Sequence, residues 1–232
     1  MPRIIYIHVP KCGGSSFGAA LRLRYLASQA TVELDQGDTG LNRADRILSD
    51  YAARRIELHG HVAARKRLIS GHVQYDADLH AGAANTYRFV TMLRDPVERF
   101  VSHYNYLQRK HPNPKRANTL DGFLETADAA RIAAQYMFYF AGHWQTPTTD
   151  TAALIDTAIK NLSRFDLVGD LAAPDVFARK LRHLTGTPLI RLRRNVAPVP
   201  ITIPPHLCAR IETLCAPDIA IYQSQFPQQI AA

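Results

Sequence analysis

A glycine-bearing loop directly after the first apolar segment constrains this 232-residue chain more than any other feature. Residues 4–9 are apolar and rich in β-branched side chains, which predicts a buried strand. Pro10 ends that strand, and Gly13-Gly14 permit a sharp turn and a close approach of the backbone to a ligand. Ser15-Ser16 are suitable caps for the helix that we expect next. The chain therefore begins with a strand, a glycine turn and a helix.

Such a turn is suited to binding an anion. The first N–H groups of a helix lack intrahelical partners and lie at the positive end of its dipole, so a phosphate binds there favourably. Lys11 adds a full positive charge at the same place. We predict a phosphate-binding loop of a group-transfer enzyme, made of Lys11, Cys12, Gly13, Gly14, Ser15 and Ser16. The alternative is an ordinary strand-to-helix turn of an α/β protein.

The loop differs from three better-known phosphate-binding patterns. In the P-loop of nucleotide hydrolases the lysine follows the glycines, whereas Lys11 precedes them. The dinucleotide-binding pattern requires a glycine spacing that Gly13, Gly14 and Gly18 do not provide. A cysteine phosphatase would have an arginine to close the loop, at the position of Gly18. Ordinary ATPase chemistry is therefore not favoured.

Composition limits the class of protein and of partner. The 28 Lys and Arg against 20 Asp and Glu give a formal net charge of +8, which favours a nucleic acid, a phosphorylated cofactor or an acidic glycan as partner. Aromatic residues do not alternate with basic ones as in a nucleic-acid platform, so no nucleic acid is expected. Three cysteines form neither a disulfide framework nor a paired metal motif, and no apolar run reaches membrane-spanning length. We expect a cytoplasmic protein without a metal or a membrane span.

Strand and helix patterns alternate along the chain, which predicts an α/β fold with a mainly parallel sheet flanked by helices. After the first strand, further strands are expected at 67–69, 85–93, 165–169 and 188–192. Residues 30–42 are expected to form a loop, and 119–141 two helical stretches, the second a mainly aromatic core segment. We predict a single domain over residues 1–232, with a helical insertion around 112–162.

Three predicted strands end in polar loops that suit an anionic ligand. These loops are Lys11–Ser16, Arg94-Asp95-Pro96 and Arg193-Arg194-Asn195. Because the carboxyl ends of parallel strands share one edge of the sheet, the loops are expected to surround one ligand with two phosphate-like groups. Asp95 and Pro96 suit the start of a helix, and Ser102 lies two turns into it.

Two similar tetrads supply candidates for a catalytic base. His61 lies in His59-Gly-His-Val62, and His72 lies in Ser70-Gly-His-Val73. By local sequence alone the two histidines are equally suitable. We favour His72 because a short predicted strand precedes it and Tyr75 follows it.

Three motifs stand out together: Pro10-Lys-Cys-Gly-Gly-Ser-Ser-Phe17, Ser70-Gly-His-Val-Gln-Tyr75 and Leu93-Arg-Asp-Pro-Val-Glu-Arg-Phe-Val-Ser-His-Tyr104. They resemble the PAPS-dependent sulfotransferases (PAPS is 3′-phosphoadenosine 5′-phosphosulfate), and among them the carbohydrate type that includes heparan sulfate 2-O-sulfotransferase. Segments 165–169 and 192–195 also match in order, so the resemblance spans most of the chain. It implies the P-loop-like sulfotransferase fold. One departure is Ser70, where the 2-O type has a second histidine.

The resemblance also implies residue roles. The loop from Lys11 to Ser16 would hold the 5′-phosphosulfate of PAPS, and Arg94 and Ser102 the 3′-phosphate. His72 would be the base, and residues 193–195 would close the donor site. The acceptor would be a hydroxyl group of a glycan or glycoconjugate, and the product of the donor would be PAP. The oligomeric state is not indicated.

Transfer of a sulfuryl group requires in-line positioning and stabilisation of the charge on the leaving oxygen, which amides and Lys11 can supply without a metal. A hydroxyl acceptor requires a base such as imidazole. Two alternatives remain: a kinase-like phosphotransferase, which would need Mg²⁺ and ATP, and a non-enzymatic basic protein that binds polyanions with strong salt dependence.

Overall fold

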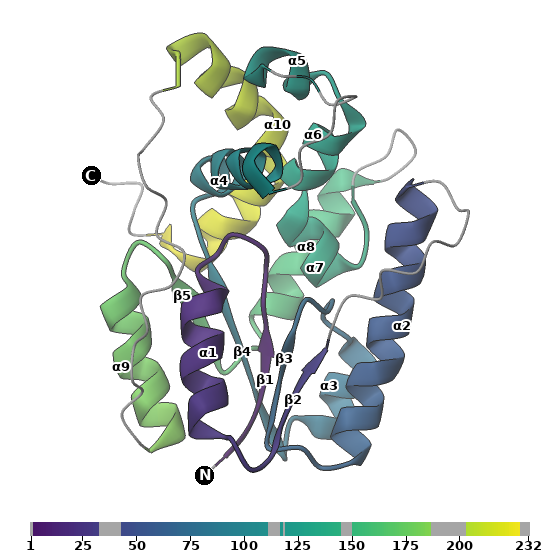
Figure 1. The fold of residues 1–232 in the computed structure, drawn as a ribbon, viewed down its shortest axis with the longest axis vertical. Coiled ribbons are helices and arrows are strands. Elements are labelled where there is room, and N and C mark those ends of the chain that lie inside the picture. Colours follow the sequence, from purple (N-terminus) through teal and green to yellow (C-terminus); the bar gives the residue numbers. More distant parts are fainter. Residues whose placement is uncertain are drawn as a thin grey trace.

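The computed structural model describes residues 2–32, 43–110, 117, 119–144, 150–186 and 203–227. Within these residues, five parallel strands form one sheet in the order β2-β3-β1-β4-β5 (Figure 1). The strands are β1 (Arg3–Ile7), β2 (Gln29–Val32), β3 (Leu68–Gly71), β4 (Tyr87–Leu93) and β5 (Leu167–Asp170). The predicted α/β fold with a mainly parallel sheet is confirmed.

Helices cover both faces of the sheet. They are α1 (Gly14–Arg24), α2 (Arg43–Ala63), α3 (Ala77–Ala83), α4 (Pro96–Lys110), α5 (Leu120–Leu124), α6 (Ala127–Ala133), α7 (Gln135–Ala141), α8 (Thr151–Leu162), α9 (Pro174–Thr185) and α10 (Pro205–Gln225). One face packs against α1 and α9, and the other against α2, α3, α7 and α8 (Figure 1). Among the described residues, no helix has both the length and the apolar character needed to cross a membrane.

The central strand β1 shows how the sheet is buried on both sides. In β1, Ile4 and Tyr6 pack toward α1 and α9, whereas Ile5 and Ile7 pack toward the opposite layer. All four side chains are at most 1% exposed. A strand that is buried on both faces is encoded by a continuous apolar run, which is the pattern in residues 4–9.

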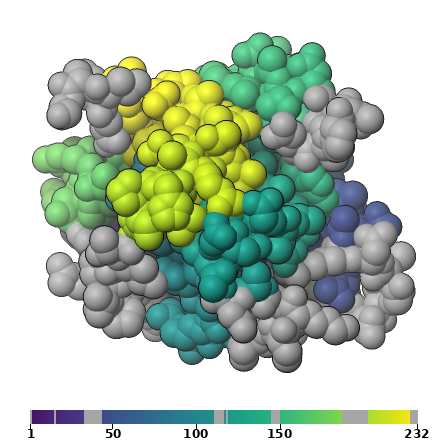
Figure 2. All heavy atoms as spheres, turned by 90° about the horizontal axis from the view of Figure 1, so that it is seen from above, coloured from purple at the N-terminus to yellow at the C-terminus, as the bar shows by residue number. Residues whose placement is uncertain are grey.

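A third helical layer lies beyond the carboxyl ends of the strands. Phe100 and Tyr104 of α4 pack with residues of α5, α6 and α10. Figure 2, which views the molecule from above, shows α10 (yellow) beside the teal residues of α5 and α6 on this end. This layer therefore adjoins the edge of the sheet where the polar loops emerge.

Two local predictions were wrong. Part of the expected loop 30–42 belongs to β2, a four-residue edge strand that pairs with β3. Its sequence has no apolar run, so the pairing with β3 determines its structure. Residues 119–141 form three short helices rather than two, because Thr119 and Thr126 each cap a new helix. The aromatic core prediction held, since Tyr136, Phe138, Tyr139 and Phe140 are at most 2% exposed. The expected strand at 188–192 lies outside the described residues.

Candidate active site

The glycine loop joins β1 to α1 through two left-handed residues. Lys11 has a φ of 67° and Gly13 a φ of 72°. The N–H of Cys12 donates to the carbonyl of Val9 at 3.3 Å, and α1 begins at Gly14. The N-cap is Gly13, not a serine as the sequence suggested, so the cap residue offers no side-chain acceptor. The first N–H groups of α1 therefore point out of the helix toward this loop.

Close packing explains both glycines. A Cβ at Gly13 would lie 2.5 Å from Cδ1 of Leu171, and the positive φ itself disfavours other residues. A Cβ at Gly14 would lie 1.8 Å from Cδ2 of His8. The start of α1 is thus pressed against the end of β1, which keeps the loop compact.

Basic side chains from three segments gather beside the loop. The ammonium group of Lys11 lies 4.2 Å from the ring centroid of Tyr106 on α4. Burial lowers the pKa of Lys11, and the positive charges of Arg109 and Arg94 lower it further. These three cations repel one another in the ligand-free protein. An anion bound among them would relieve that repulsion.

Arg94 directly follows β4, the strand next to β1, and therefore lies at the same edge of the sheet as Lys11. Its Nε is 3.0 Å from a carboxylate oxygen of Glu98, and its side chain is 27% exposed. Asp95 caps α4 as predicted, by accepting a hydrogen bond from the N–H of Glu98 at 3.0 Å. Ser102 is half-buried on α4, one turn after Glu98. Arg94 and Ser102 are thus on connected segments beside the loop.

Some predicted site residues cannot be placed in this way. Arg193, Arg194 and Asn195 lie outside the described residues, and of Ser15 only the backbone in the first turn of α1 is described.

His72 follows β3 on the other side of β1. Its Nδ1 lies 2.7 Å from the carbonyl oxygen of His8, and since a carbonyl only accepts, Nδ1 carries the proton. In the neutral ring Nε2 is then the unprotonated nitrogen, as a base requires. Burial lowers the pKa of His72 to about 4. The guanidinium of Arg54 donates to the carbonyl of His72 at 2.8 Å and fixes its backbone.

His61 lies elsewhere. It belongs to the last turns of α2, where its Nε2 is 3.1 Å from a carboxylate oxygen of Glu57. Its carbonyl accepts from the N–H of Lys66, just before the amino end of β3. His61 is therefore at the opposite edge of the sheet from Lys11, whereas His72 is at the same edge.

Sequence patterns missed several residues at this edge. The ring of His8 stacks on that of His72, with centroids 4.4 Å apart. His103 of α4 is half-buried; desolvation lowers its pKa to about 3, and the charges of Arg99 and Lys11 contribute to the shift. Its Nδ1 has no hydrogen-bond partner among the described residues.

Of the missed residues, Tyr106 and Arg109 carried a usable signal, since they follow Ser102 by four and seven positions on one helix. His8 and His103 carried none.

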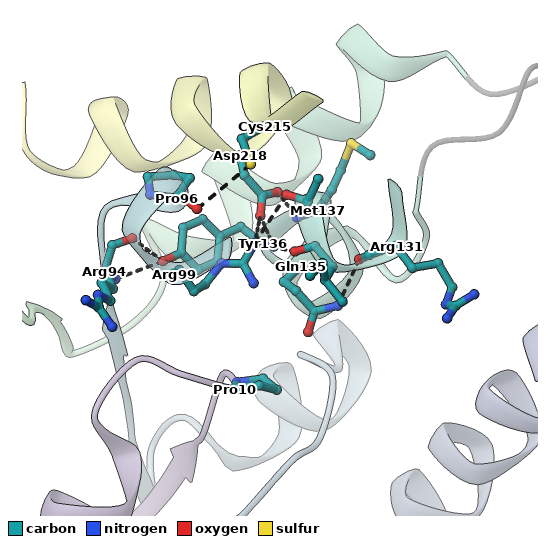
Figure 3. Close-up of polar contacts among 12 residues, drawn as sticks. Pro10, Arg94, Pro96, Arg99, Arg131, Gln135, Tyr136, Met137, Cys215 and Asp218 are labelled. Atoms are coloured by element: carbon teal, nitrogen blue, oxygen red, sulfur yellow. Dashed lines mark hydrogen bonds and ion pairs between the residues drawn. The ribbon is translucent and has the colours of Figure 1, made fainter. Parts of the chain in front are cut away.

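Tyr136 joins two parts of the site and was also missed as a site residue. Its hydroxyl accepts from the backbone N–H of Arg94 at 2.8 Å, a contact that Figure 3 shows. The same hydroxyl lies 3.5 Å from Sγ of Cys12. Burial raises the pKa of Cys12 to about 11, so this thiol is protonated and is not a reactive thiolate.

Comparisons with known proteins concern the family and the fold of the chain. No curated protein sequence matches the chain. A sulfotransferase from Alicyclobacillus acidocaldarius has a similar structure, with a TM-score of 0.53 and 16% identity, over 98% of this chain and 96% of that one. Mouse sulfotransferase SULT7A1 complexed with PAP gives a TM-score of 0.45 and 14% identity, over 91% of this chain and 63% of that one. At such identities only the fold is compared. The model of the sulfotransferase family, however, matches residues 2–189, and the chain therefore belongs to the sulfotransferase family.

Proposed function

We propose that this sulfotransferase moves the sulfuryl group of PAPS to a hydroxyl group of a carbohydrate. The observation that carries the proposal is the grouping of Lys11, Arg94 and Arg109 around the start of α1, with the neutral imidazole of His72 on the neighbouring strand. The cations suit an anionic donor, and the imidazole suits activation of a neutral alcohol.

In this proposal the amides at the start of α1 and Lys11 bind the 5′-phosphosulfate. Arg94 and Ser102 bind the 3′-phosphate, and residues 193–195 complete the donor site. The donor supplies the reactive sulfur–oxygen bond when it is bound. Nε2 of His72 takes the proton of the acceptor hydroxyl as its oxygen bonds to sulfur, and the bond from sulfur to the 5′-phosphate oxygen breaks. Lys11 stabilises the negative charge that remains on that phosphate.

The carbohydrate acceptor rests on the resemblance of the motifs around Lys11, His72 and Arg94 to carbohydrate sulfotransferases. The net charge of +8 is consistent with an acidic glycan. A glycan with free hydroxyls and a simple phenol should therefore be compared as acceptors of labelled sulfate from PAPS. Transfer to the phenol alone would overturn the carbohydrate assignment.

The donor is tested by the thermal stabilisation of the protein by PAP, by adenosine 5′-phosphate, by ATP with Mg²⁺ and by heparin. Ligands that bind the folded state raise the melting temperature in a saturable way. We expect PAP to stabilise the protein at the lowest concentration, and adenosine 5′-phosphate to be weaker because it lacks the 3′-phosphate. Preference for ATP with Mg²⁺ would instead indicate a phosphotransferase. A salt-sensitive response to heparin alone would indicate a polyanion-binding protein.

A further inference from the structure

Tyr136 lies where the two halves of the proposed donor site meet. It is fully buried, and its hydroxyl group accepts from the backbone N–H of Arg94 at 2.8 Å and donates to the carbonyl of the same residue (Figure 3). Sγ of Cys12, in the glycine loop, lies 3.5 Å from the same hydroxyl. One side chain of α7 therefore contacts both the residue after β4 and the loop after β1.

The backbone of Arg94 needs this contact. The pairing of β4 with β1 ends at Thr91, and its pairing with β5 ends at Leu93. Arg94 thus lies past the last paired residue on either side. A backbone N–H or carbonyl that is shielded from water and lacks a partner is costly, and the hydroxyl of Tyr136 is a partner for both the N–H and the carbonyl of Arg94. It thereby fixes the orientation of the two peptide groups on either side of the Arg94 Cα.

Tyr136 is itself held by a buried ion pair. The carboxylate of Asp218 on α10 accepts from the backbone N–H groups of Tyr136 at 2.8 Å and of Met137 at 3.1 Å. Arg99 of α4 lies 3.5 Å from that carboxylate, and its guanidinium carbon is 5.4 Å from the centroid of the Tyr136 ring. Burial would lower the pKa of Arg99, but the Asp218 carboxylate together with the nearby Tyr136, Cys12 and Cys215 raises it. Figure 3 shows Asp218 above Tyr136 and Arg99 beside the Tyr136 ring, so α4 and α10 fix the backbone and ring of Tyr136.

We propose that Tyr136 is a positioning residue that sets the spacing between the phosphate loop at Cys12 and the backbone of Arg94. The two segments are the proposed sites for the 5′ and 3′ ends of the donor, so their spacing determines whether one molecule reaches both. The inference rests on the proposed function for its ligand. Tyr136 acts through Cys12 and Arg94, and it does not contact the reacting atoms.

The test compares Tyr136→Phe with Tyr87→Phe. Tyr87 is a buried residue at the other end of β4, and its hydroxyl donates to the carbonyl of Lys66 at 2.8 Å. Both variants lose one tyrosine hydroxyl, but only Tyr136→Phe loses the contact with the site. We expect Tyr136→Phe to weaken PAP binding about tenfold, measured by titration calorimetry, and Tyr87→Phe to leave it unchanged.

Amide hydrogen exchange of the ligand-free protein supplies a second readout that does not depend on the donor. In Tyr136→Phe, peptides that cover residues 10–16 and 93–95 should exchange faster than in the wild type, and in Tyr87→Phe they should not. The proposal is overturned if Tyr136→Phe keeps wild-type PAP affinity and wild-type exchange in these peptides. If the wild type does not bind PAP, the donor assignment fails, while the exchange data still decide the positioning role.

A second variant covers the case in which Tyr136→Phe does not fold. Cys12→Ala removes only the loop side of the contact. It should increase exchange of residues 10–16 and leave residues 93–95 unchanged, because Tyr136 still holds Arg94. Wild-type exchange of residues 10–16 in this variant would show that the contact does not hold the loop, and would contradict the proposal.

Discussion

The carbonyl oxygen of His8 lies 2.7 Å from Nδ1 of His72, and the two imidazole rings stack with their centroids 4.4 Å apart. One histidine follows β1 and the other follows β3, so this contact ties the proposed base to the strand that carries the phosphate loop. The ring of His8 also lies against Gly14, where α1 begins. The proposed base and the proposed phosphate-binding loop are therefore parts of one packed unit.

The pH dependence of the reaction should reflect the burial of His72. Burial lowers its pKa from 6.5 to about 4, so the imidazole is neutral and able to accept a proton at neutral pH. We expect kcat/KM to fall on the acid side only as the pH approaches about 4, since this ratio reports the free enzyme. The profile is measured alongside an NMR titration of the His72 ring. A decline centred near 6.5 would show that His72 titrates as an exposed histidine.

Protein stability should depend on pH for the same reason. Because the folded protein keeps His72 neutral while the unfolded chain protonates it, the unfolded state binds more protons between pH 6.5 and about 4. This stabilising contribution is complete above 6.5 and is lost as the pH falls toward 4. In chemical denaturation, the free energy of unfolding of His72→Ala should therefore change less over this interval than that of the wild type. If the free energy of unfolding changed equally with pH in His72→Ala and in the wild type, this result would contradict the burial of a neutral imidazole at His72.

Two glycine substitutions in α1 should have opposite effects on stability. A Cβ at Gly14 would lie 1.8 Å from the His8 ring, so Gly14→Ala should destabilise the protein by about 1–3 kcal/mol through overpacking. A Cβ at Gly18 would lie 3.2 Å from the end of the flexible Arg22 side chain and 3.7 Å from Cε1 of Tyr6, an ordinary contact. Gly18→Ala should therefore stabilise α1 by about 0.5–1 kcal/mol. Thermal denaturation of both variants checks this, and a stable Gly14→Ala protein would refute the packing against His8.

Substitution of Lys11 should separate catalysis from stability. Lys11→Ala should lower kcat by about 10²–10³, because it removes the charge that, in the proposed mechanism, stabilises the leaving phosphate. The free energy of unfolding of ligand-free Lys11→Ala should change little compared with this loss of kcat, because the variant relieves the charge repulsion with Arg94 and Arg109. Lys160→Ala, which removes a lysine from α8, is the matched control and should keep full activity.

The backbone at Lys11 adds a further comparison. Because φ at this position is 67°, Lys11→Gly should be about 1 kcal/mol more stable than Lys11→Ala. Melting temperatures of the two variants without ligand measure the difference. Near-normal turnover by either variant would refute the catalytic role of Lys11.

The role of Arg94 is testable by comparing two nucleotides. Arg94→Gln should weaken binding of PAP but not of adenosine 5′-phosphate, because only PAP carries the 3′-phosphate. Glu98→Gln should do the reverse and strengthen PAP binding, since Glu98 now lies 3.0 Å from the Arg94 side chain and competes for it. Titration of each variant with both nucleotides is the measurement. An equal loss for both nucleotides in Arg94→Gln would place Arg94 at the 5′ end instead.

Local sequence determined the parts of this protein that depend on neighbours in the chain. The mainly apolar segments at 4–9 and 87–93 predicted β1 and β4, because a strand buried on both faces needs no strict alternation. Asp95 and Pro96 predicted the start of α4 through capping, and Gly13-Gly14 predicted the turn before α1. Parallel strand order then placed Lys11 and Arg94 at one edge, as expected from their positions after strands.

Only the tertiary structure decided which of two similar tetrads adjoins that edge, and which buried side chains support it. His61 and His72 differ in the end of the sheet that they occupy, which depends on the direction of β3 relative to α2. The hydroxyl of Tyr136 reaches Arg94 across 42 positions, and Nδ1 of His72 reaches His8 across 64. Periodicity and capping relate residues a few positions apart, so contacts over such separations arise only when the packed layers bring the segments together.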